Sequence, residues 1–362
     1  MQVVLSNSSF KWGGVHTVTE LLARGLAARG HGVTVFCRPD SELQKRLKSV
    51  APTVPILHGP DLGPAVIARC ARALVRARAQ VVITIMDKDL RLTGMAARLA
   101  KLPVIARRAN DQPLEGAWRR FFYQRVATHV VANSEATRST LLASAPVLRR
   151  RGIEVIRNGI DVDVFASASP ALLDLPADAV VFGFVGRFDA RKGLHELVDA
   201  WPAVAAAVPA AHLVLVGRGG LEAEAHERLD CDPRVHFTGY RDDVAALLRA
   251  FDVLVMPSHW EGFGLVAAEA MAAGVPVIAG NASSLRELVR DGVNGRLVPV
   301  RDAAALARTM TELGTDAELR ARMGGKGMEI ARREFHADTM LDRWEALLER
   351  VVRDNHEGHR AR

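Results

Sequence analysis

The stretch from Met256 to Gly280, MPSHWEGFGLVAAEAMAAGVPVIAG, constrains the fold of this chain more than any other. An apolar run ending at Met256 precedes a loop, an apolar helix expected over 264–273 and a strand expected over 275–279. Strand, loop, helix and strand of these lengths predict a right-handed βαβ unit in a parallel sheet. Such sheets bind ligands at the carboxyl ends of their strands, so the loop from Ser258 to Phe263 should face a binding crevice.

Glycines and carboxylates in this stretch indicate the kind of ligand. Gly262 and Gly264 allow the backbone to approach a ligand closely, and the amides that open the following helix favour an anion. Glu261 and Glu269 flank this anion site, and a carboxylate accepts hydrogen bonds from sugar or ribose hydroxyls beside a phosphate. These features predict a nucleotide-sugar. A purely structural alternative is that Glu269 suits an early helical turn and that the glycines only shape the loop.

The same stretch resembles the signature of the retaining family 4 glycosyltransferases. The residues that carry the resemblance are Glu261-Gly262-Phe263-Gly264 and Glu269. The resemblance implies the α/β fold called GT-B, in which the parallel sheets of two Rossmann-like domains face each other across a central cleft. It also implies that Glu261 contacts the donor sugar, that Glu269 contacts the nucleotide ribose, and that the amides from Gly262 to Leu265 hold the diphosphate.

A second segment, from Gly186 to Gly193, resembles the Gly-Arg-x4-Lys-Gly loop of that family. The resemblance implies that Arg187 and Lys192 clamp the donor diphosphate. Two cations there would neutralise phosphate charge and then stabilise the departing nucleoside diphosphate. The alternative is that both are ordinary surface cations.

Three shorter segments resemble further parts of the family. Gly13-Gly14, after the first strand, resembles the N-terminal glycine loop that approaches the donor diphosphate and the acceptor, although such a pair also commonly shapes a loop. Asn158 to Asp161 resembles the turn that ends the first domain. Thr238-Gly239-Tyr240 matches the place where the family holds the nucleotide base, which makes Tyr240 a candidate donor contact.

Length and composition indicate two domains. A chain of 362 residues with 49% hydrophobic residues can bury two cores. We expect a basic, acceptor-binding domain over 1–165 and a donor-binding domain over 166–338, joined by an Ala-, Ser- and Pro-rich hinge at 165–179. The last helix, about 339–353, should pack back on the N-terminal domain, as the resemblance implies.

Charge is divided unevenly between the two halves. Residues 1–165 contain 25 Lys and Arg against 12 Asp and Glu, whereas the remainder contains 23 against 29. A basic domain suits an anionic acceptor, an anionic membrane surface or nucleic acid. We find no nucleic-acid motif, and only 5% of residues are aromatic, so nucleic acid is not expected. An expected amphipathic helix over 65–78 carries a basic stripe, which is either a solvated face or a membrane contact.

Polar residues that follow strands in the basic half are the candidates for the acceptor side. Asp87 follows a strand expected over 81–86 and is a candidate catalytic group, although many family members have a histidine near this place and this chain has none. The candidate acceptor-binding residues are Lys88, Arg107, Arg108 and Asn110. The Asp-x-Asp tripeptides at 87–89 and 161–163 are better explained as strand-end, turn and cap residues than as metal ligands, so neither a metal nor another cofactor is expected.

Targeting signals and cysteine usage suggest where the chain works. Cys37, Cys70 and Cys231 lie far apart and are expected to be buried free thiols in a reducing compartment. The start of the chain lacks the pattern of a signal peptide, and no run of about 20 apolar residues is free of charge. We therefore expect a cytoplasmic protein, with peripheral attachment to the inner face of the cytoplasmic membrane as a further expectation.

The resemblance as a whole implies a retaining, metal-independent glycosyltransferase that uses a nucleoside-diphosphate sugar. The leaving phosphate would take the proton of the acceptor, and no side-chain nucleophile would be required. A lipid-linked sugar, a lipopolysaccharide core or another cell-envelope glycan is the expected acceptor. The alternatives are an epimerase or phosphorylase of the same fold, and a non-catalytic two-domain protein that binds a sugar or a nucleotide.

Overall fold

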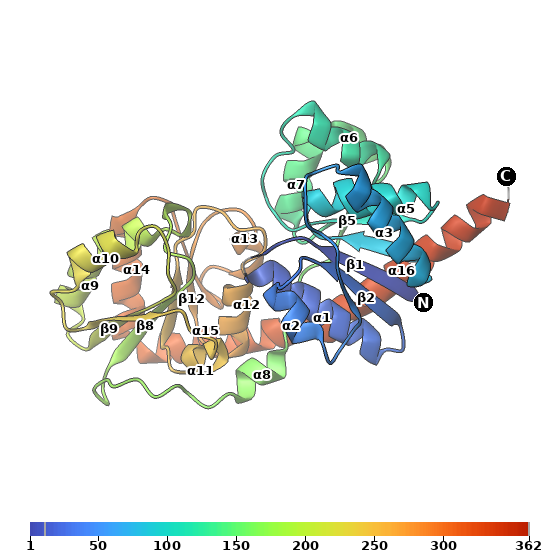
Figure 1. Cartoon of the computed structure of the whole chain (residues 1–362). Helices are drawn as coiled ribbons and strands as arrows, with labels where there is room; N and C mark the ends of the chain where they lie inside the picture. The colour runs from blue at the N-terminus through green and yellow to red at the C-terminus, as the bar shows by residue number, and fades with distance from the viewer. Residues whose placement is uncertain (11, 361–362) are drawn as a thin grey trace. The chain divides into compact units, whose positions relative to one another are not determined.

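The computed structural model describes the backbone of residues 1–10 and 12–360 and the side chains of 1–10 and 12–357 (Figure 1). The chain divides into two compact units: unit 1 contains Met1–Gly159 and Ala337–Arg362, and unit 2 contains Ile160–His336. No helix in the described part of the chain combines the length and the apolar character that crossing a bilayer requires.

Unit 1 is built on a seven-stranded parallel sheet with helices on both faces. In sheet order its strands are β3 (Thr53–Pro55), β2 (Gly32–Cys37), β1 (Gln2–Asn7), β4 (Val81–Thr84), β5 (Val104–Arg108), β6 (His129–Ala132) and β7 (Glu154–Val155). The central strands are nearly continuous apolar runs because both faces are covered; Leu5, for example, pairs in register with Val35 on one side and Ile83 on the other.

The helices of unit 1 connect these strands. They are α1 (Gly14–Ala28), α2 (Glu42–Leu47), α3 (Pro64–Arg76), α4 (Asp87–Asp89), the π-helical η1 (Leu90–Gly94), α5 (Met95–Leu99), α6 (Ala117–Arg125), α7 (Glu135–Ser144), the 3-10 helix η2 (Pro146–Arg150) and α16 (Ala337–Arg360). One hydrophobic cluster joins α3, α5, α6, α7 and η2 to the sheet, through residues such as Leu74, Ala97, Phe122, Leu141 and Leu148, so these elements cover one face.

The last helix, α16, belongs to unit 1 and packs against α1. A Cβ at Gly25 of α1 would lie 2.3 Å from the Leu341 side chain, so the absence of a side chain at Gly25 makes room for this leucine. Arg29, at the end of α1, bonds Asp342 at 2.6 Å and Glu345 at 3.0 Å. The helix is longer than the sequence indicated, since it begins at Ala337 and continues to Arg360.

Unit 2 is built on a six-stranded parallel sheet. In sheet order its strands are β10 (Val235–Gly239), β9 (Ala211–Val216), β8 (Val180–Val185), β11 (Val253–Met256), β12 (Val277–Gly280) and β13 (Gly295–Val298). Its helices are α8 (Val162–Ser167), η3 (Ala190–Lys192), α9 (Leu194–Ala207), α10 (Glu222–Leu229), α11 (Val244–Arg249), α12 (Leu265–Ala272), α13 (Leu285–Leu288), α14 (Ala303–Thr315) and α15 (Ala317–Glu334).

The chain leaves unit 1 after Gly159, earlier than the expected boundary at 165. The reason is that Ile160 and Val162, which begins α8, are buried in the core of unit 2. The expected hinge residues run along unit 2, where the Ala171 N–H donates to the Ala246 carbonyl at 2.8 Å. Gly159 itself packs so closely on the Ala337 backbone that a side chain there would lie 2.7 Å from the Ala337 Cα.

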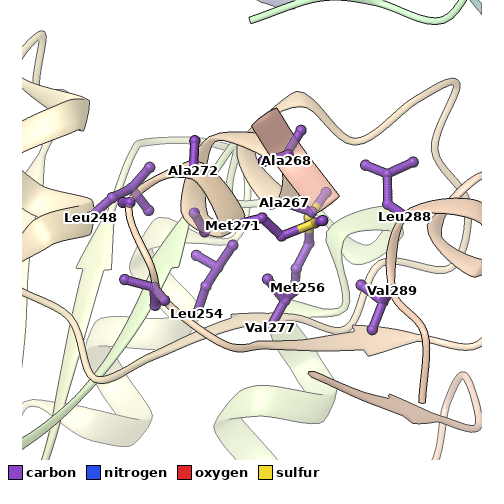
Figure 2. Close-up of a cluster of buried hydrophobic side chains, with 14 of the residues drawn as sticks. Leu248, Leu254, Met256, Ala267, Ala268, Met271, Ala272, Val277, Leu288 and Val289 are labelled. Atoms are coloured by element: carbon purple, nitrogen blue, oxygen red, sulfur yellow. The ribbon is translucent and has the colours of Figure 1, made fainter. Parts of the chain in front are cut away.

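Helix α12, in the stretch from which the fold was predicted, is apolar on almost every side because it is buried between layers. Figure 2 shows Ala267 and Met271 facing Leu254, Met256 and Val277 of β11 and β12. Helix α15 packs against α12 as well, and a Cβ on Gly327 would contact the Met271 backbone at 3.4 Å. A helix that is apolar all round is typical of such a position.

Candidate functional site

In unit 2 two loops meet where the sheet reverses its strand order. β8 and β11 are neighbours in the sheet although they are far apart in the chain, and β8 is followed by β9 on its other side. The loop 186–193 follows β8 and the loop 257–264 follows β11. Ligands of open parallel sheets bind at such a switch point, outside the carboxyl ends of the strands.

Lys192 and Glu261 join the two loops directly. The Lys192 Nζ lies 2.5 Å from the Glu261 Oε1, and their side chains are only 16% and 10% exposed. The 186–193 loop is held in shape by Asp189, whose carboxylate accepts the Lys192 backbone N–H at 3.1 Å. The expected diphosphate-binding cation is therefore paired with the expected sugar-binding carboxylate.

Two glycines are required where these loops pack. Gly193 has a φ of 72°, and a Cβ there would lie 2.2 Å from the Pro257 carbonyl oxygen. Gly264 has a φ of 94°, and a Cβ there would lie 2.9 Å from Leu285. Both conformations favour glycine, so Gly264 is explained by local packing as well as by the expected approach of a ligand.

Arg187, in contrast to Lys192, is largely exposed. Its side chain is 64% exposed, and its Nε lies 2.8 Å from the Asp189 carboxylate. A ligand phosphate could be reached by this guanidinium without unpacking the loop, because an exposed ion pair contributes little to stability.

The 261–265 segment is anchored by backbone contacts from the next loop. Ser283 and Ser284 each donate a hydroxyl hydrogen bond to the Glu261 carbonyl, at 2.7 and 2.9 Å. Ser284 is also the N-cap residue of α13, but its side chain makes no cap hydrogen bond to that helix. Phe263 is buried edge-on against Phe335, with ring centroids 5.7 Å apart, and Leu265 is half-buried at the start of α12.

Glu269 is the unusual carboxylate of the group because it lies in the buried helix α12. Burial raises its pKa to about 7, well above the ordinary value for glutamate. Its side chain remains partly accessible to solvent, and none of the described residues donates a hydrogen bond to it. A partly accessible carboxyl without a protein partner is suited to bonding a ligand hydroxyl.

Tyr240 lies after β10 and is 59% exposed, with its hydroxyl donating to Asp242 at 3.0 Å. The strand β10 ends at Gly239, so Tyr240 directly follows it. The ring therefore stands at the carboxyl end of the sheet, where the resemblance put the nucleotide base.

A histidine that the sequence did not single out ties the 257–264 loop to α9. The His259 Nε2 lies 2.8 Å from the Glu196 Oε1, and both side chains are less than a fifth exposed. The second oxygen of Glu196 and the hydroxyl of Ser258 are buried and have no hydrogen-bond partner among the described residues. His259 and Glu196 lie 63 residues apart in the chain, so no local sequence pattern could have predicted that they pair.

Unit 1 has a corresponding switch point between β1 and β4, and Asp89 joins the loops there. Its carboxylate accepts the Ser8 N–H at 2.9 Å and the Met86 N–H at 2.8 Å. Burial raises its pKa to about 7 although those hydrogen bonds act in the opposite direction. The sequence pointed to Asp87 and missed Asp89. Gly13 ends the loop that follows β1 and Gly14 begins α1, and no heavy atom of the described residues lies within 4 Å of the place a Cβ on Gly13 would take.

Asp87 is engaged by protein groups. The Arg108 Nη1 donates to both of its oxygens at 3.0 and 3.1 Å, and the Tyr123 hydroxyl donates at 2.8 Å. Arg119 approaches at 3.8 Å. This arrangement fixes the carboxylate as the centre of an ion-pair network between β5 and α6, and a role in catalysis remains a prediction.

The four expected acceptor-binding residues lie in different surroundings. Arg107 and Arg108 were expected beyond a strand over 104–106, but they are its last two residues and are buried. Arg107 donates to Asn158 at 2.6 Å, its Nη1 has no hydrogen-bond partner in the described part of the chain, and burial lowers its pKa to about 10. The Asn110 carbonyl accepts from Arg108 at 3.1 Å, and Lys88 donates to the Gly59 carbonyl at 3.0 Å.

The cysteines are free thiols, and one expectation about them is wrong. Cys37 and Cys70 are buried, and burial raises the pKa of each to about 11, so they are poor nucleophiles. Cys231 is exposed because it lies in the turn after α10 and not in a core. Within the described residues no group of three or more His, Cys, Asp or Glu is arranged to hold a metal ion.

Comparison with known proteins identifies the class. The model for "Glycosyltransferase Family 4" matches residues 12–164, and the model for "Glycosyl transferases group 1" matches residues 179–316. A phosphatidyl-myo-inositol mannosyltransferase of Mycobacterium leprae is 32% identical over 339 residues, which is 89% of each chain. The lipopolysaccharide core biosynthesis glycosyltransferase LpsE of Rhizobium meliloti is 35% identical over 202 residues, which is 55% of this chain and 58% of LpsE.

Solved structures show the same fold. The Anabaena protein HepE, crystallised with UDP and glucose, superposes with a TM-score of 0.82 at 24% identity, covering 96% of this chain and 99% of HepE. Two parallel sheets of this kind, each with its loops gathered at a switch point, define a protein of the GT-B fold. The chain belongs to the glycosyl transferases of group 1 and family 4, and it is a glycosyltransferase.

Proposed function

We propose that the chain transfers a sugar from a nucleoside-diphosphate sugar with retention of anomeric configuration and without a metal ion. The observation that carries the proposal is the ion pair of Lys192 with Glu261 at the switch point of unit 2, with Arg187 exposed on the same loop as Lys192. Two cations and a carboxylate are the set that a diphosphate joined to a sugar needs. Other members of the fold support a nucleotide donor, since HepE has been crystallised with UDP-glucose.

Donor binding replaces the contacts seen in the free protein. Lys192 and Arg187 turn to the diphosphate, and the amides from Gly262 to Leu265 donate to it at the start of α12. Glu261, released from Lys192, accepts hydrogen bonds from the sugar, and Glu269 bonds the ribose. Gly13 and Gly14 are further proposed contacts of the diphosphate, and Tyr240 contacts the base.

Sugar transfer depends on stabilising the negative charge of the leaving diphosphate. As the bond from the sugar to the diphosphate breaks, negative charge develops on the leaving phosphate oxygen, and Arg187 and Lys192 stabilise it. That oxygen takes the proton of the acceptor hydroxyl, which attacks the same face of the sugar. Because two protein cations offset the charge of the diphosphate, the reaction needs no metal ion.

Unit 1 supplies the acceptor side of the proposal. The M. leprae relative is named for mannosyl transfer to a phosphatidyl-inositol lipid, and LpsE for lipopolysaccharide core biosynthesis. A lipid-linked sugar, lipopolysaccharide core or other cell-envelope glycan is therefore the proposed acceptor, bound near Lys88, Arg107, Arg108 and Asn110. The proposed location is the cytoplasm, with peripheral attachment to the inner face of the cytoplasmic membrane.

Thermal unfolding against a panel of UDP, GDP and ADP and their sugars, with and without EDTA, tests the donor site. We expect one base to raise the unfolding temperature, and chelation to leave that shift unchanged. Slow hydrolysis of the same donor, followed by proton NMR of the released sugar, should give first the anomer present in the donor. No shift with any nucleotide at millimolar concentration would overturn the donor site; loss of the shift in EDTA, or release of the opposite anomer, would overturn metal independence or retention.

A further inference from the structure

Positive charge in this chain is concentrated in one segment. Residues 61–151 contain 17 Lys and Arg against six Asp and Glu, whereas the rest of the chain contains 31 against 35. The whole formal net charge of +7 therefore originates in this segment. It comprises the helical layer of α3, α5, α6, α7 and η2 that covers one face of the unit 1 sheet.

Helix α6 presents exposed aromatic rings and cations on the outside of that layer, which we call the α6 surface; it consists of Trp118, Arg119, Arg120, Phe121 and Arg125. Trp118 and Phe121 are 58% and 43% exposed, and their rings stack with centroids 5.7 Å apart. All three arginines are exposed, and none of the described carboxylates lies within ion-pair distance of Arg120 or Arg125.

The inner side of the same helix is firmly anchored. Phe122 and Tyr123 are buried in the core of unit 1, and the Tyr123 hydroxyl donates to Asp87. Helix α6 is therefore a fixed part of the fold. Poor packing of the helix does not explain why its outward aromatic rings are exposed. Two large, neighbouring aromatic rings that are exposed to solvent indicate a surface that a binding partner covers.

Neighbouring helices of the layer continue the pattern. Val75 and Leu99, each 71% exposed, line a shallow hollow between α3 and α5 together with Arg72 and Arg76. Figure 1 shows α3, α5 and α6 on one side of the unit 1 sheet. Apolar groups interleaved with cations thus occur on more than one helix of this layer.

We propose that the α6 surface docks unit 1 on an anionic lipid bilayer. Trp118 and Phe121 enter the headgroup region, where rings that are apolar and polarisable are preferred. Arg119, Arg120 and Arg125 contact lipid phosphates while their aliphatic stems lie along the bilayer surface. This surface was not expected from the sequence, which pointed to the helix over 65–78. The inference rests on the proposed lipid-linked acceptor, because a membrane-bound acceptor requires the enzyme at the surface.

Vesicle co-sedimentation of the full chain tests the docking directly. Vesicles of phosphatidylglycerol and phosphatidylcholine (3:7) should bind the protein at 0.1 M salt, and vesicles of phosphatidylcholine alone should bind it far less. The double variant Arg120→Gln/Arg125→Gln should bind about 30-fold more weakly, because each cation near an anionic leaflet contributes about fivefold to binding. Trp118→Ser/Phe121→Ser should bind at least about tenfold more weakly.

Matched variants in unit 2 serve as controls. Val164→Ser/Leu172→Ser removes exposed apolar groups, and Arg308→Gln/Arg322→Gln removes two exposed charges; neither should change vesicle binding. Quenching of tryptophan fluorescence by brominated lipid should vanish in Trp118→Phe, which keeps an insertable ring. Binding that is equal in wild type and both α6 variants, or quenching that persists in Trp118→Phe, would overturn the proposal.

Two further outcomes separate this inference from the proposed function. The nucleotide-induced thermal shift is measured without vesicles, and the α6 variants should retain it. A normal nucleotide shift with no vesicle binding would overturn the docking and leave the proposed function standing. Binding of the α6 surface to single-stranded oligonucleotides in place of vesicles would also overturn the docking, because stacked aromatics and arginines suit that partner as well.

Discussion

At the scale of single residues, the site is organised by carboxylates whose surroundings differ. Glu261 is paired with a cation, whereas Glu269 is partly accessible, receives no hydrogen bond from the described residues and has a pKa that burial raises to about 7. In the proposed function the first must exchange Lys192 for a sugar, and the second gains hydroxyl donors on binding. The ion pair of Glu261 and the raised pKa of Glu269 each affect the free energy of unfolding, which can be measured without substrate.

Lys192→Ala should destabilise unit 2 by about 2–3 kcal/mol because it leaves the Glu261 carboxylate largely buried and unpaired. The double variant Lys192→Ala/Glu261→Gln should lose less than the sum of the single changes, since the charge is removed with its partner. Denaturant unfolding measures both. Lys326→Ala, which breaks the exposed pair with Glu329, should change the free energy of unfolding by less than about 1 kcal/mol, and strict additivity at 192 and 261 would contradict the interpretation.

Glu269→Gln should become more stabilising as pH rises. The folded-state pKa of Glu269 is raised to about 7, so between about pH 4.5 and 7 the unfolded chain is ionised while the folded chain retains the proton. Wild type therefore loses stability across this window, by as much as about 3 kcal/mol, and the variant does not. Denaturant unfolding at pH 5 and pH 8 measures the difference. A difference in stability between the variant and wild type that does not depend on pH would contradict the shifted pKa.

At the scale of elements, most of the fold was predictable because parallel strands buried on both faces are apolar runs between glycine turns. The 253–280 segment shows this clearly: its strand, helix and strand appear within two residues of the expected bounds. The ends of strands that carry polar residues were less predictable. Arg107 and Arg108 extend β5, because their side chains find partners inside unit 1 and the backbone continues its ladder with β6.

The parts of the candidate site that sequence could not supply are contacts between distant segments. Asp87 and Asp89 are two residues apart, and nothing local distinguishes the one that pairs with Arg108 from the one that receives backbone N–H groups at the switch point. His259 and Glu196 come together only through the packing of a loop on α9. The loop after β11 was predicted from the strand, loop and helix pattern and the 186–193 loop from a resemblance, but the direct ion pair between the two loops was not predicted.

Gly193→Ala should disrupt the packing of those two loops. The added Cβ would meet the Pro257 carbonyl oxygen at 2.2 Å, and alanine disfavours the positive φ. We expect a loss of more than about 2 kcal/mol in the free energy of unfolding, together with weaker nucleotide binding. Gly325→Ala, in α15 with open space around it, should instead stabilise by about 0.5–1 kcal/mol. Equal effects of the two changes would contradict the account of loop packing.

At the scale of the whole molecule, the chain runs through unit 1, then unit 2, and returns to unit 1 with α16. Leu341, Trp344 and Leu347 of this helix are buried, and Arg29 is held by its carboxylates. Unit 2 is continuous in sequence from Ile160 to His336 and contains every proposed donor contact except Gly13 and Gly14. Loss of the last helix should therefore affect the two units differently.

Truncation after His336 should unfold unit 1 at a lower temperature and leave the nucleotide-induced stabilisation of unit 2 in place. The reason is that the buried face of α16 is lost from unit 1 only. Differential scanning calorimetry with and without nucleotide measures the two transitions. Truncation after Arg353, which keeps Leu341 to Val352, should behave nearly as the full chain. Loss of nucleotide binding on truncation after His336 would contradict the prediction that unit 2 binds the nucleotide without α16.

The central claim is that the 186–193 and 257–264 loops of unit 2 bind the donor diphosphate. Isothermal titration of the stabilising nucleoside diphosphate into wild type, Arg187→Ala and Lys192→Ala tests it most directly, with Lys326→Ala as the control. Each change in the loop should raise Kd at least about tenfold, because each removes a charge-assisted bond to phosphate worth about 1.5–3 kcal/mol. An unchanged Kd in both loop variants would contradict the claim and place the nucleotide elsewhere in the chain.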